Sequence, residues 1–418
     1  MVSDALLSLA SQRIVTPDGI RSGYLHICGD KITGIDETPR GRVIDYHDAM
    51  LMPGFVDIHV HGWGRGSFAW KGERDSLRAM SEDLVYAGVT AWLATSATQP
   101  EDFLCQSLAT AAEWIAQATP ADGAEAVGIH MEGPYINPKF IGMQRLDSVQ
   151  PPSIAGFERY QRAARGHVRL MTLAPELPGA LALIRHLHQA GVTVSAGHTD
   201  ATFDEISEAI TAGLSHFTHA FSAMRGLHHR EPGVVGALMY YEDTYAEVAK
   251  QSGITLRPEV FDILYRLKKD RRLVMMSDCL GYVDFPEGFE FHHYLRQETF
   301  RIRQQSLEIT DCHGCTRTIS AEDWPEVRKL EMSFLDSVKN VVGRLEHGWV
   351  SAAQIACLNP AILAGVADRK GSLTPGKDAD ILVLDDQQEL QAVWCGVVAC
   401  ASRWLNKDVA VLLLKEGF

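Results

Sequence analysis

The sequence predicts an α/β protein built on a (β/α)8 barrel of the TIM type, with a small β-sandwich domain formed from both chain ends. From about residue 53, short apolar runs alternate with segments whose apolar residues recur at three- and four-residue steps. The segments 75–88 and 178–191 end on glycine, as helices often do. The apolar runs, which are the expected barrel strands, lie at 54–59, 91–95, 126–130, 168–173, 192–196, 214–218, 245–249 and 273–277.

The two chain ends have a different pattern, which is typical of small antiparallel sheets. Near the N-terminus, short runs are separated by a turn at Pro17-Asp18-Gly19 and another at Gly29-Asp30. Near the C-terminus, apolar runs occur at 379–384 and 390–398. Because both ends share this pattern, we expect their strands to pair with each other.

The chain length also favours two domains, because 418 residues exceed the size at which a single core stops growing. We expect residues 1–52 and 347–418 to form the β-sandwich domain and residues 53–346 to form the barrel. The segment 284–330 is polar, aromatic and irregular in pattern, and it is expected to be an insertion or a lid.

Composition excludes several classes of protein. The net charge of −14 and the lack of a Lys/Arg-rich block argue against nucleic-acid binding. The first residues do not resemble a signal peptide and no run of 18 apolar residues occurs, so we expect neither a signal peptide nor a membrane segment. The eight cysteines are scattered, which favours reduced thiols and a cytoplasmic protein. Cys312 and Cys315 have metal-like spacing, but no second CxxC pair completes a four-ligand zinc site.

Metal-ligand residue types stand where the first and third expected strands end. His59 and His61 are two residues apart, so their side chains share one face of a strand. Glu132 follows His130 and precedes Gly-Pro, which ends the strand. A buried glutamate is costly unless it is paired or binds a metal, although an ion pair with an arginine is the alternative. We expect His130 to lie behind the ligands.

Three further strand ends carry residues of the same kind. His198 ends one strand, and His219 ends the next, where His216 competes with it because spacing does not separate the two. His228 and His229 follow in a loop. Asp278 ends the last strand and is placed to act as a general base, unless it only caps the following helix.

Together, these side chains indicate a metal-dependent hydrolase, since barrel enzymes keep their active sites at the C-terminal strand ends. Imidazole and carboxylate ligands suit zinc, our first candidate, as well as iron(II), manganese or nickel, better than calcium. Such an ion polarises a carbonyl and lowers the pKa of bound water from 15.7 to about 7. Asp278 could then take a proton from this water and pass it to a leaving nitrogen.

The same residues resemble motifs of the amidohydrolase superfamily and, within it, of the N-acetylglucosamine-6-phosphate deacetylase family. The resemblance covers most of the chain and weakens over 284–330. The shared motifs are Pro53–Gly62, Gly128–Pro134, Leu173–Glu176, Ala196–Thr199, Thr218–Met224, Arg230–Gly233 and Gly371–Ile381.

The resemblance implies a metal site with one or two divalent ions per subunit. By this resemblance, Glu132, His198 and His219 are ligands of the main metal. His59 and His61 match a second metal position, which Glu132 could bridge.

It also implies roles outside the metal ligands. It selects His219 over His216 and makes Asp278 the catalytic aspartate. Arg230 matches an arginine that binds the substrate phosphate, in relatives from across a dimer interface, so a homodimer is expected.

Several substrate-contact positions depart from the family pattern. Gln144 stands where the family usually has a histidine, and Ser222-Ala223 replaces Asn-Ala. Thr255 replaces another histidine near the phosphate, for which Arg257 could partly substitute. We take these residues as substrate-binding candidates with altered specificity.

The resulting expectation is hydrolysis of the N-acetyl amide of an amino-sugar 6-phosphate, either N-acetylglucosamine-6-phosphate or its galactosamine epimer. The alternative on the same barrel is a deacylase or amidohydrolase for a different N-acyl or cyclic amide substrate. A catalytically inactive sugar-phosphate sensor is disfavoured, because the ligands and Asp278 are all present.

Overall fold

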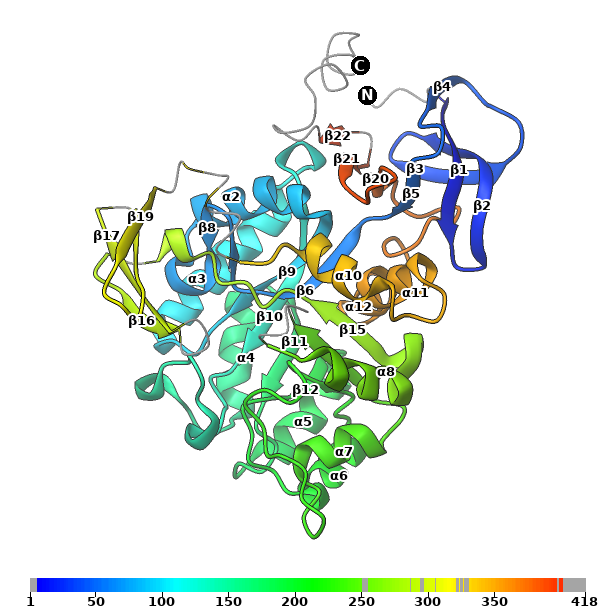
Figure 1. Ribbon diagram of the computed structural model, residues 1–418. Coiled ribbons are helices and arrows are strands. Elements are labelled where there is room, and N and C mark those ends of the chain that lie inside the picture. Colours follow the sequence, from blue (N-terminus) through cyan, green and yellow to red (C-terminus); the bar gives the residue numbers. More distant parts are fainter. Residues whose placement is uncertain are drawn as a thin grey trace.

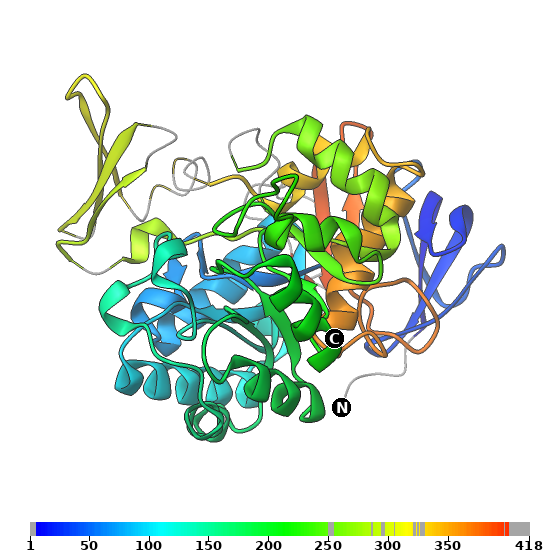
Figure 2. The same cartoon turned by 90° about the horizontal axis from the view of Figure 1, so that it is seen from below.

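The computed structural model describes a barrel flanked by two smaller sheets (Figure 1). The described residues are 6–249, 255–285, 287–293, 297–304, 306–320, 323, 326, 331–396 and 398–400. The two flanking sheets lie on opposite sides of the barrel in both views (Figures 1 and 2). Within the described residues, no helix has the length and apolar character needed to cross a membrane.

The barrel wall consists of parallel strands in sequence order, eight of them in the described part of the chain. Each strand pairs with the next along the wall. The eight predicted strands are therefore confirmed, with small shifts at their ends. The strands are β6 (Phe55–Val60), β9 (Val89–Ser96), β10 (Glu125–Glu132), β11 (Val168–Leu173), β12 (Thr193–Ala196), β13 (His216–Phe217), β14 (Tyr245–Ala249) and β15 (Leu273–Met276).

The barrel closes between its first strand, β6, and its last strand, β15. These two strands do not form a regular ladder, but backbone hydrogen bonds join the residues at and just beyond their C-terminal ends. The Asp278 amide donates to the His59 carbonyl at 2.8 Å, and the His61 amide donates to the Cys279 carbonyl at 2.9 Å. This seam therefore runs between the residues that were singled out as candidate ligands and base.

Helices surround the wall and supply the outer layer of the core. The predicted helical segment 75–88 forms α2 (Arg74–Leu84) and a 3-10 turn (Val85–Ala87), which ends at Gly88 with a φ of 79°. The other helices of this layer are α3 (Glu101–Gln117), α4 (Ile154–Ala163), α5 (Ala180–Gln189), α6 (Phe203–Ala212), α7 (Gly233–Tyr240) and α8 (Pro258–Arg272).

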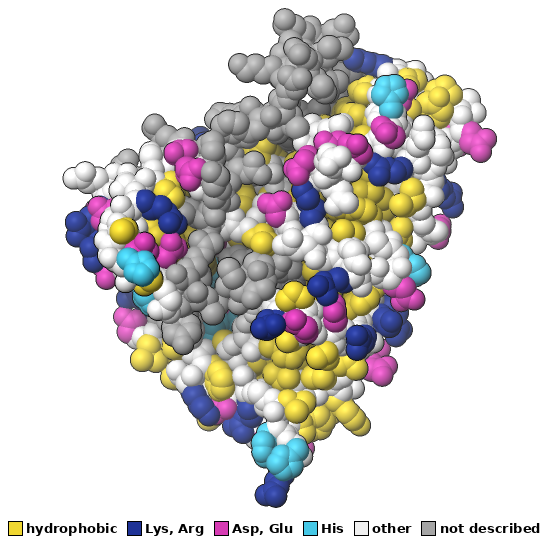
Figure 3. Space-filling model, viewed as in Figure 1, with side chains coloured by type: hydrophobic (Ala, Val, Ile, Leu, Met, Phe, Trp, Pro, Cys, Tyr) yellow, Lys and Arg dark blue, Asp and Glu magenta, His cyan; other side chains and the backbone are white. Residues whose placement is uncertain are grey.

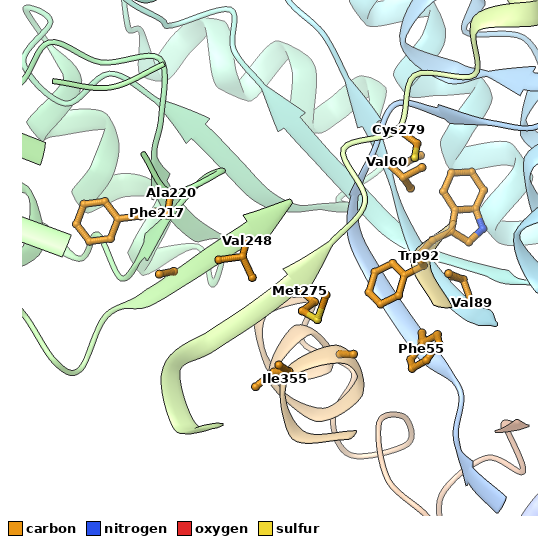
Figure 4. Close-up of a cluster of buried hydrophobic side chains, with 14 of the residues drawn as sticks. Phe55, Val60, Val89, Trp92, Phe217, Ala220, Val248, Met275, Cys279 and Ile355 are labelled. Atoms are coloured by element: carbon orange, nitrogen blue, oxygen red, sulfur yellow. The ribbon is translucent and has the colours of Figure 1, made fainter. Parts of the chain in front are cut away.

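The main core lies between the strands and these helices (Figure 4). Trp92 of β9 is fully buried, and its indole N–H donates to the Ala124 carbonyl at 3.1 Å. Phe55 of β6 packs against Phe334 of α10 (Phe334–Val342), with ring centroids 5.1 Å apart. The burial of large side chains on both sides of the wall explains why the strands are continuous apolar runs in the sequence.

Strands from both chain ends form one small sheet, as the sequence predicts. Its order is β22-β21-β20-β5-β1-β2-β3, β4 pairs with β1, and β20 runs antiparallel to β5. The sheet has its own apolar core, separate from the barrel core. Its strands are β1 (Leu6–Thr16), β2 (Gly19–Cys28), β3 (Lys31–Asp36), β4 (Arg42–Asp45), β5 (Met50–Pro53), β20 (Ile381–Leu384), β21 (Leu390–Cys395) and β22 (Val398–Cys400).

Buried charges connect this sheet to the barrel. The Lys370 ammonium lies 2.7 Å from Asp380, 2.9 Å from Asp378 and 2.8 Å from Glu125 of β10. Opposing carboxylates raise the pKa of Lys370 even though burial of the ammonium acts in the other direction. The lysine therefore stays charged and holds three carboxylates together.

Helices lie between the predicted domain boundary at 346–347 and the small sheet. They are α11 (Trp349–Ala353), a π-helix (Gln354–Leu358) and α12 (Asn359–Leu363). They pack against the barrel, where the Asn359 amide donates to the Leu273 carbonyl at 2.8 Å. The exact boundary of the two domains stays a prediction.

The described part of 284–330 is more regular than its sequence pattern predicts. It contains a four-stranded antiparallel sheet of β16 (Glu290–His293), β17 (Glu298–Arg303), β18 (Ser306–Thr310) and β19 (Thr316–Ser320). Phe300, Ile302, Leu307 and Ile309 alternate with polar residues and are buried in a local apolar cluster. This sheet projects from the barrel (Figure 2), and its role as an insertion or a lid stays a prediction.

Candidate metal centre

Imidazole and carboxylate side chains gather at the C-terminal ends of β6, β10, β12, β13 and β15. They form two groups that could hold a metal ion: Glu132, His198 and His219, and His59, His61 and Asp278. Within each group the ligand atoms lie within 4.8 Å of one another. These residues lie up to 219 positions apart in the chain, so only the closed barrel brings both groups together.

The first group is centred on one oxygen of Glu132. The Nε2 atoms of His198 and His219 lie 3.1 and 3.0 Å from Glu132 Oε1, and 3.1 Å from each other. All three residues are buried.

The second group lies directly beside the first. The Nε2 atoms of His59 and His61 are 3.3 Å apart, and each is 3.6 Å from Asp278 Oδ1. Glu132 Oε2 lies 3.1 Å from His61 Nε2, so the glutamate faces both groups. The Asp278 side chain keeps 29% of its surface exposed, which leaves it accessible to a substrate.

The hydrogen bonds of the histidines show which ring nitrogen faces the centre. His61, His198 and His219 each place Nδ1 against a backbone carbonyl, at 3.2, 2.7 and 3.1 Å. His59 places Nδ1 against the carboxylate of Glu247 at 3.1 Å. These partners only accept hydrogen bonds, so Nδ1 carries the proton, and in the neutral ring Nε2 presents its lone pair.

This arrangement fits a bound cation. Paired lone pairs on His59 and His61, and on His198 and His219, would repel each other at separations of 3.3 and 3.1 Å. A divalent ion held by the nitrogens and the Glu132 carboxylate satisfies these lone pairs, and mixed nitrogen and oxygen donors suit transition metals or zinc.

The electrostatics of the site point in the same direction. Burial disfavours ionised Glu132, but the surrounding histidines, above all His59 and His198, hold its pKa well below the ordinary value. Burial also opposes the imidazolium form of His59, yet Glu132 and Glu247 raise the pKa of His59 well above its usual range. The carboxylates thus favour positive charge at the point where the ligand atoms meet.

The backbone is unusual at three of these residues. His198, His219 and Asp278 have φ values of 48°, 30° and 48°, in the left-handed region that residues other than glycine rarely adopt. Such conformations cost about 1–3 kcal/mol each and cluster at functional sites, where the surrounding structure maintains them.

Two further histidines are buried near the centre but stand outside both groups. His130 bonds to the Ile58 carbonyl at 3.1 Å and to the Thr172 hydroxyl at 2.8 Å. Burial lowers the pKa of His216 to about 4, so this ring is neutral. Of the two histidines that compete on β13, the structure brings His219 to the ligand group.

Glu247 is not among the residues predicted from the sequence; it lies on β14, with its carboxylate 3.1 Å from His59 Nδ1. It is fully buried, and although burial opposes its ionised form, His216 and His59 lower its pKa to about 2. The signal was a glutamate inside the apolar run 245–249, a position where a charged residue needs a partner.

Some substrate-binding candidates lie at the centre. The Gln144 amide donates to Glu132 Oε2, and its oxygen accepts from the Thr98 backbone amide at 2.6 Å. Ser222 is exposed, and its carbonyl accepts from His219 Nδ1. The carbonyl of its neighbour Ala223 accepts from the Thr199 amide at 3.2 Å.

Other candidates lie on the surface. Thr255 donates to the Ala249 carbonyl at 3.1 Å, and Arg257 pairs with Glu259 at the same distance. Arg230 is exposed, like His228 and His229 before it. Figure 3 shows histidine and basic side chains together at the lower tip of the molecule. Contacts among the described residues do not join Arg230 or Arg257 to the metal-ligand candidates.

The CxxC segment lies in the turn between β18 and β19. Cys312 and Cys315 are exposed free thiols. Neither belongs to a group of metal-ligating side chains among the residues that the structure describes.

Comparison with known proteins identifies the family. The model of the amidohydrolase family matches residues 50–412. The chain is 32% identical to the N-acetylglucosamine-6-phosphate deacetylase of Bacillus subtilis (strain 168), over 92% of this chain and 94% of that one. It is 30% identical to the N-acetylgalactosamine-6-phosphate deacetylase of Escherichia coli O157:H7, over 92% and 97% of the two chains.

A solved structure supports the same assignment. A mutant N-acetyl-D-glucosamine-6-phosphate deacetylase from Mycobacterium smegmatis, in complex with N-acetyl-D-glucosamine-6-phosphate, superposes with a TM-score of 0.79 at 25% identity. The match covers 95% of this chain and 100% of that one. The fold, the candidate metal centre and these relatives together show that the chain is an enzyme of the amidohydrolase family, related to the N-acetylglucosamine-6-phosphate deacetylases.

Proposed function

We propose that this enzyme hydrolyses the N-acetyl amide of an amino-sugar 6-phosphate and releases acetate. The observation that carries the proposal is the meeting of two ligand groups on Glu132, beside the accessible carboxylate of Asp278. The names of the relatives supply the substrate class, N-acetylglucosamine-6-phosphate or its galactosamine epimer.

We propose zinc as the metal, with iron, manganese or nickel as alternatives. Glu132, His198 and His219 would hold one ion, and His59 and His61, with Asp278 near them, would hold a second. A divalent ion supplies two things here when bound: it polarises the amide carbonyl and makes water a nucleophile at neutral pH.

Proton transfer in this proposal is carried out by Asp278. Asp278 is the general base in this proposal, because its carboxylate is the exposed member of the second group. The same carboxylate, once protonated, acts as the acid and gives its proton to the leaving nitrogen. The hydrogen bond from the Asp278 amide to the His59 carbonyl keeps the backbone of the base fixed against the histidine pair.

Substrate binding is assigned in two parts. Gln144, Ser222 and Ala223 lie close enough to the centre to contact the acyl group and the sugar ring. Arg230, with Thr255 and Arg257, would bind the phosphate. Since Arg230 is exposed and no contact among the described residues joins it to the ligand groups, we propose that a homodimer partner supplies it.

The test is acetate release from matched substrates. N-acetylglucosamine-6-phosphate, N-acetylgalactosamine-6-phosphate and unphosphorylated N-acetylglucosamine are compared by kcat/KM on metal-loaded protein. Loss of one charge-assisted phosphate contact costs about 1.5–3 kcal/mol, so the sugar without phosphate is expected to be at least tenfold poorer. Equal kcat/KM with and without the phosphate would refute the proposed substrate class.

A second candidate is a deacylase for a different N-acyl or cyclic amide compound. Gln144 and Thr255, which replace family histidines, are the observation that favours it. Turnover of unphosphorylated N-acetyl sugars or N-acyl amino acids, without turnover of the sugar phosphates, would establish this candidate instead. The expected cytoplasmic location stays a prediction.

A further inference from the structure

Glu247 is a buried carboxylate beneath the candidate metal centre that the proposed reaction does not use. It lies on β14, and none of its surface is exposed. A buried carboxylate is retained only if its contacts compensate for the loss of water. Its contacts therefore indicate what it does.

One oxygen of Glu247 connects both ligand groups. Oε2 lies 3.1 Å from His59 Nδ1 and accepts from the His219 backbone amide, also at 3.1 Å. The Glu247 carbonyl accepts from the Ala220 amide at 2.9 Å. The other carboxylate oxygen lies 3.5 Å from His216 Nε2.

His59 differs from the other candidate ligands in how its ring is oriented. His61, His198 and His219 bond through Nδ1 to backbone carbonyls, which a change of side chain does not remove. Among these four histidines, His59 alone bonds through Nδ1 to a side chain. Without that carboxylate, its ring could rotate or adopt the other tautomer, and Nε2 would no longer present a lone pair to the centre.

We propose that Glu247 is a positioning residue that fixes the His59 imidazole with Nε2 toward the metal position formed by His59, His61 and Asp278. This inference rests on the proposed metal centre. It gives Glu247 the role of orienting a metal ligand, and not of binding the metal or the substrate itself.

The proposal predicts a selective loss of metal. Glu247→Ala is expected to weaken binding of one ion by roughly ten- to a hundredfold, the usual effect of removing such a partner, and to leave the ion at Glu132 in place. Glu247→Gln keeps an oxygen that accepts from both His59 and His219, so its affinity should lie between Ala and wild type. The matched control is Glu242→Gln, an exposed glutamate before β14.

The measurement is equilibrium dialysis of metal-stripped, full-length protein against graded Zn²⁺, with bound zinc counted by elemental analysis and folding checked by circular dichroism. In a His61→Ala background, which already lacks the second position, adding Glu247→Ala should change zinc affinity by less than threefold. If the effect of Glu247→Ala on zinc affinity requires His61, Glu247 acts by positioning His59 and not through a general effect on the fold.

Two results with the Glu247→Ala variants would overturn the inference alone. Two zinc ions bound with unchanged affinity by Glu247→Ala would refute it while leaving the proposed function intact. A further tenfold loss in the His61→Ala background would show that Glu247 acts on the whole fold. A wild-type chain that binds no zinc would instead refute the metal centre itself, and the inference with it.

Discussion

Replacing Gln144 by alanine would remove two hydrogen bonds at the candidate metal centre, one to the ligand Glu132 and one to the backbone of Thr98. The Gln144 amide donates to the Glu132 carboxylate, and its oxygen accepts from the Thr98 amide at 2.6 Å. A hydrogen bond to a charged group contributes about 1.5–3 kcal/mol. If this hydrogen-bond energy stabilises the conformation of Glu132 that is needed for catalysis, its loss lowers kcat/KM by roughly ten- to a hundredfold, at about 1.4 kcal/mol per factor of ten.

The second bond predicts a separate effect on stability. Thr98 is buried, so its amide would be left without the Gln144 oxygen, at a cost of about 1–3 kcal/mol. Gln144→His is the informative companion, because an imidazole N–H can still donate to Glu132 but cannot serve the Thr98 amide in the same way. We expect it to recover much of the activity and little of the stability.

The assay is acetate release at saturating metal, with metal content and thermal midpoint measured on the same preparations. Gln117→Ala on the surface of α3 serves as the control. A Gln144→Ala enzyme with full metal content and kcat/KM within threefold of wild type would show that the Gln144 hydrogen bond does not set the active arrangement of Glu132.

Three other predictions follow from separate features. Asp278→Asn should lower kcat by roughly a hundred- to ten-thousandfold in acetate release, and activity within tenfold of wild type would exclude it as the base. Lys370→Met removes the ion-pair partner of buried Asp380, while Arg369 still pairs with Glu125 and Asp378. It should destabilise the protein by about 3–5 kcal/mol in urea unfolding, whereas an unchanged midpoint would show that the Lys370 ion pairs contribute nothing net. Glu247 has its pKa lowered from 4.5 to about 2, so its contribution to the stability of metal-free protein is present above pH 4.5 and lost as pH falls toward 2. Acid titration followed by circular dichroism tests this, and Glu247→Gln should flatten that part of the curve.

The barrel could be predicted from sequence because its strands are buried on both faces. Apolar runs such as 168–173 and 245–249 therefore stand out without any partner being known. The sheet of 290–320 was harder to predict, because its alternation is confined to short stretches such as Phe300-x-Ile302. Its apolar partners, including Trp70, come from elsewhere in the chain.

The residues at the strand ends could also be predicted, since the fold fixes which end carries the site. The sequence does not reveal which side chains come into contact across the barrel. His216 and His219 are equivalent by spacing, and only the contact of His219 with Glu132 separates them. Glu247 was missed for the same reason, because its partner His59 is 188 positions away.

The seam between β6 and β15 has a consequence for how the enzyme is made. The group of Glu132, His198 and His219 can be complete once residue 219 has left the ribosome. The second group needs Asp278 beside His59, which happens only when the last barrel strand closes against the first. Ribosome-bound chains that end before residue 278 would thus hold at most one of the two metal positions. Completion of the second position coincides with closure of the barrel. A metal held there would link the first and last strands and so stabilise the closed barrel.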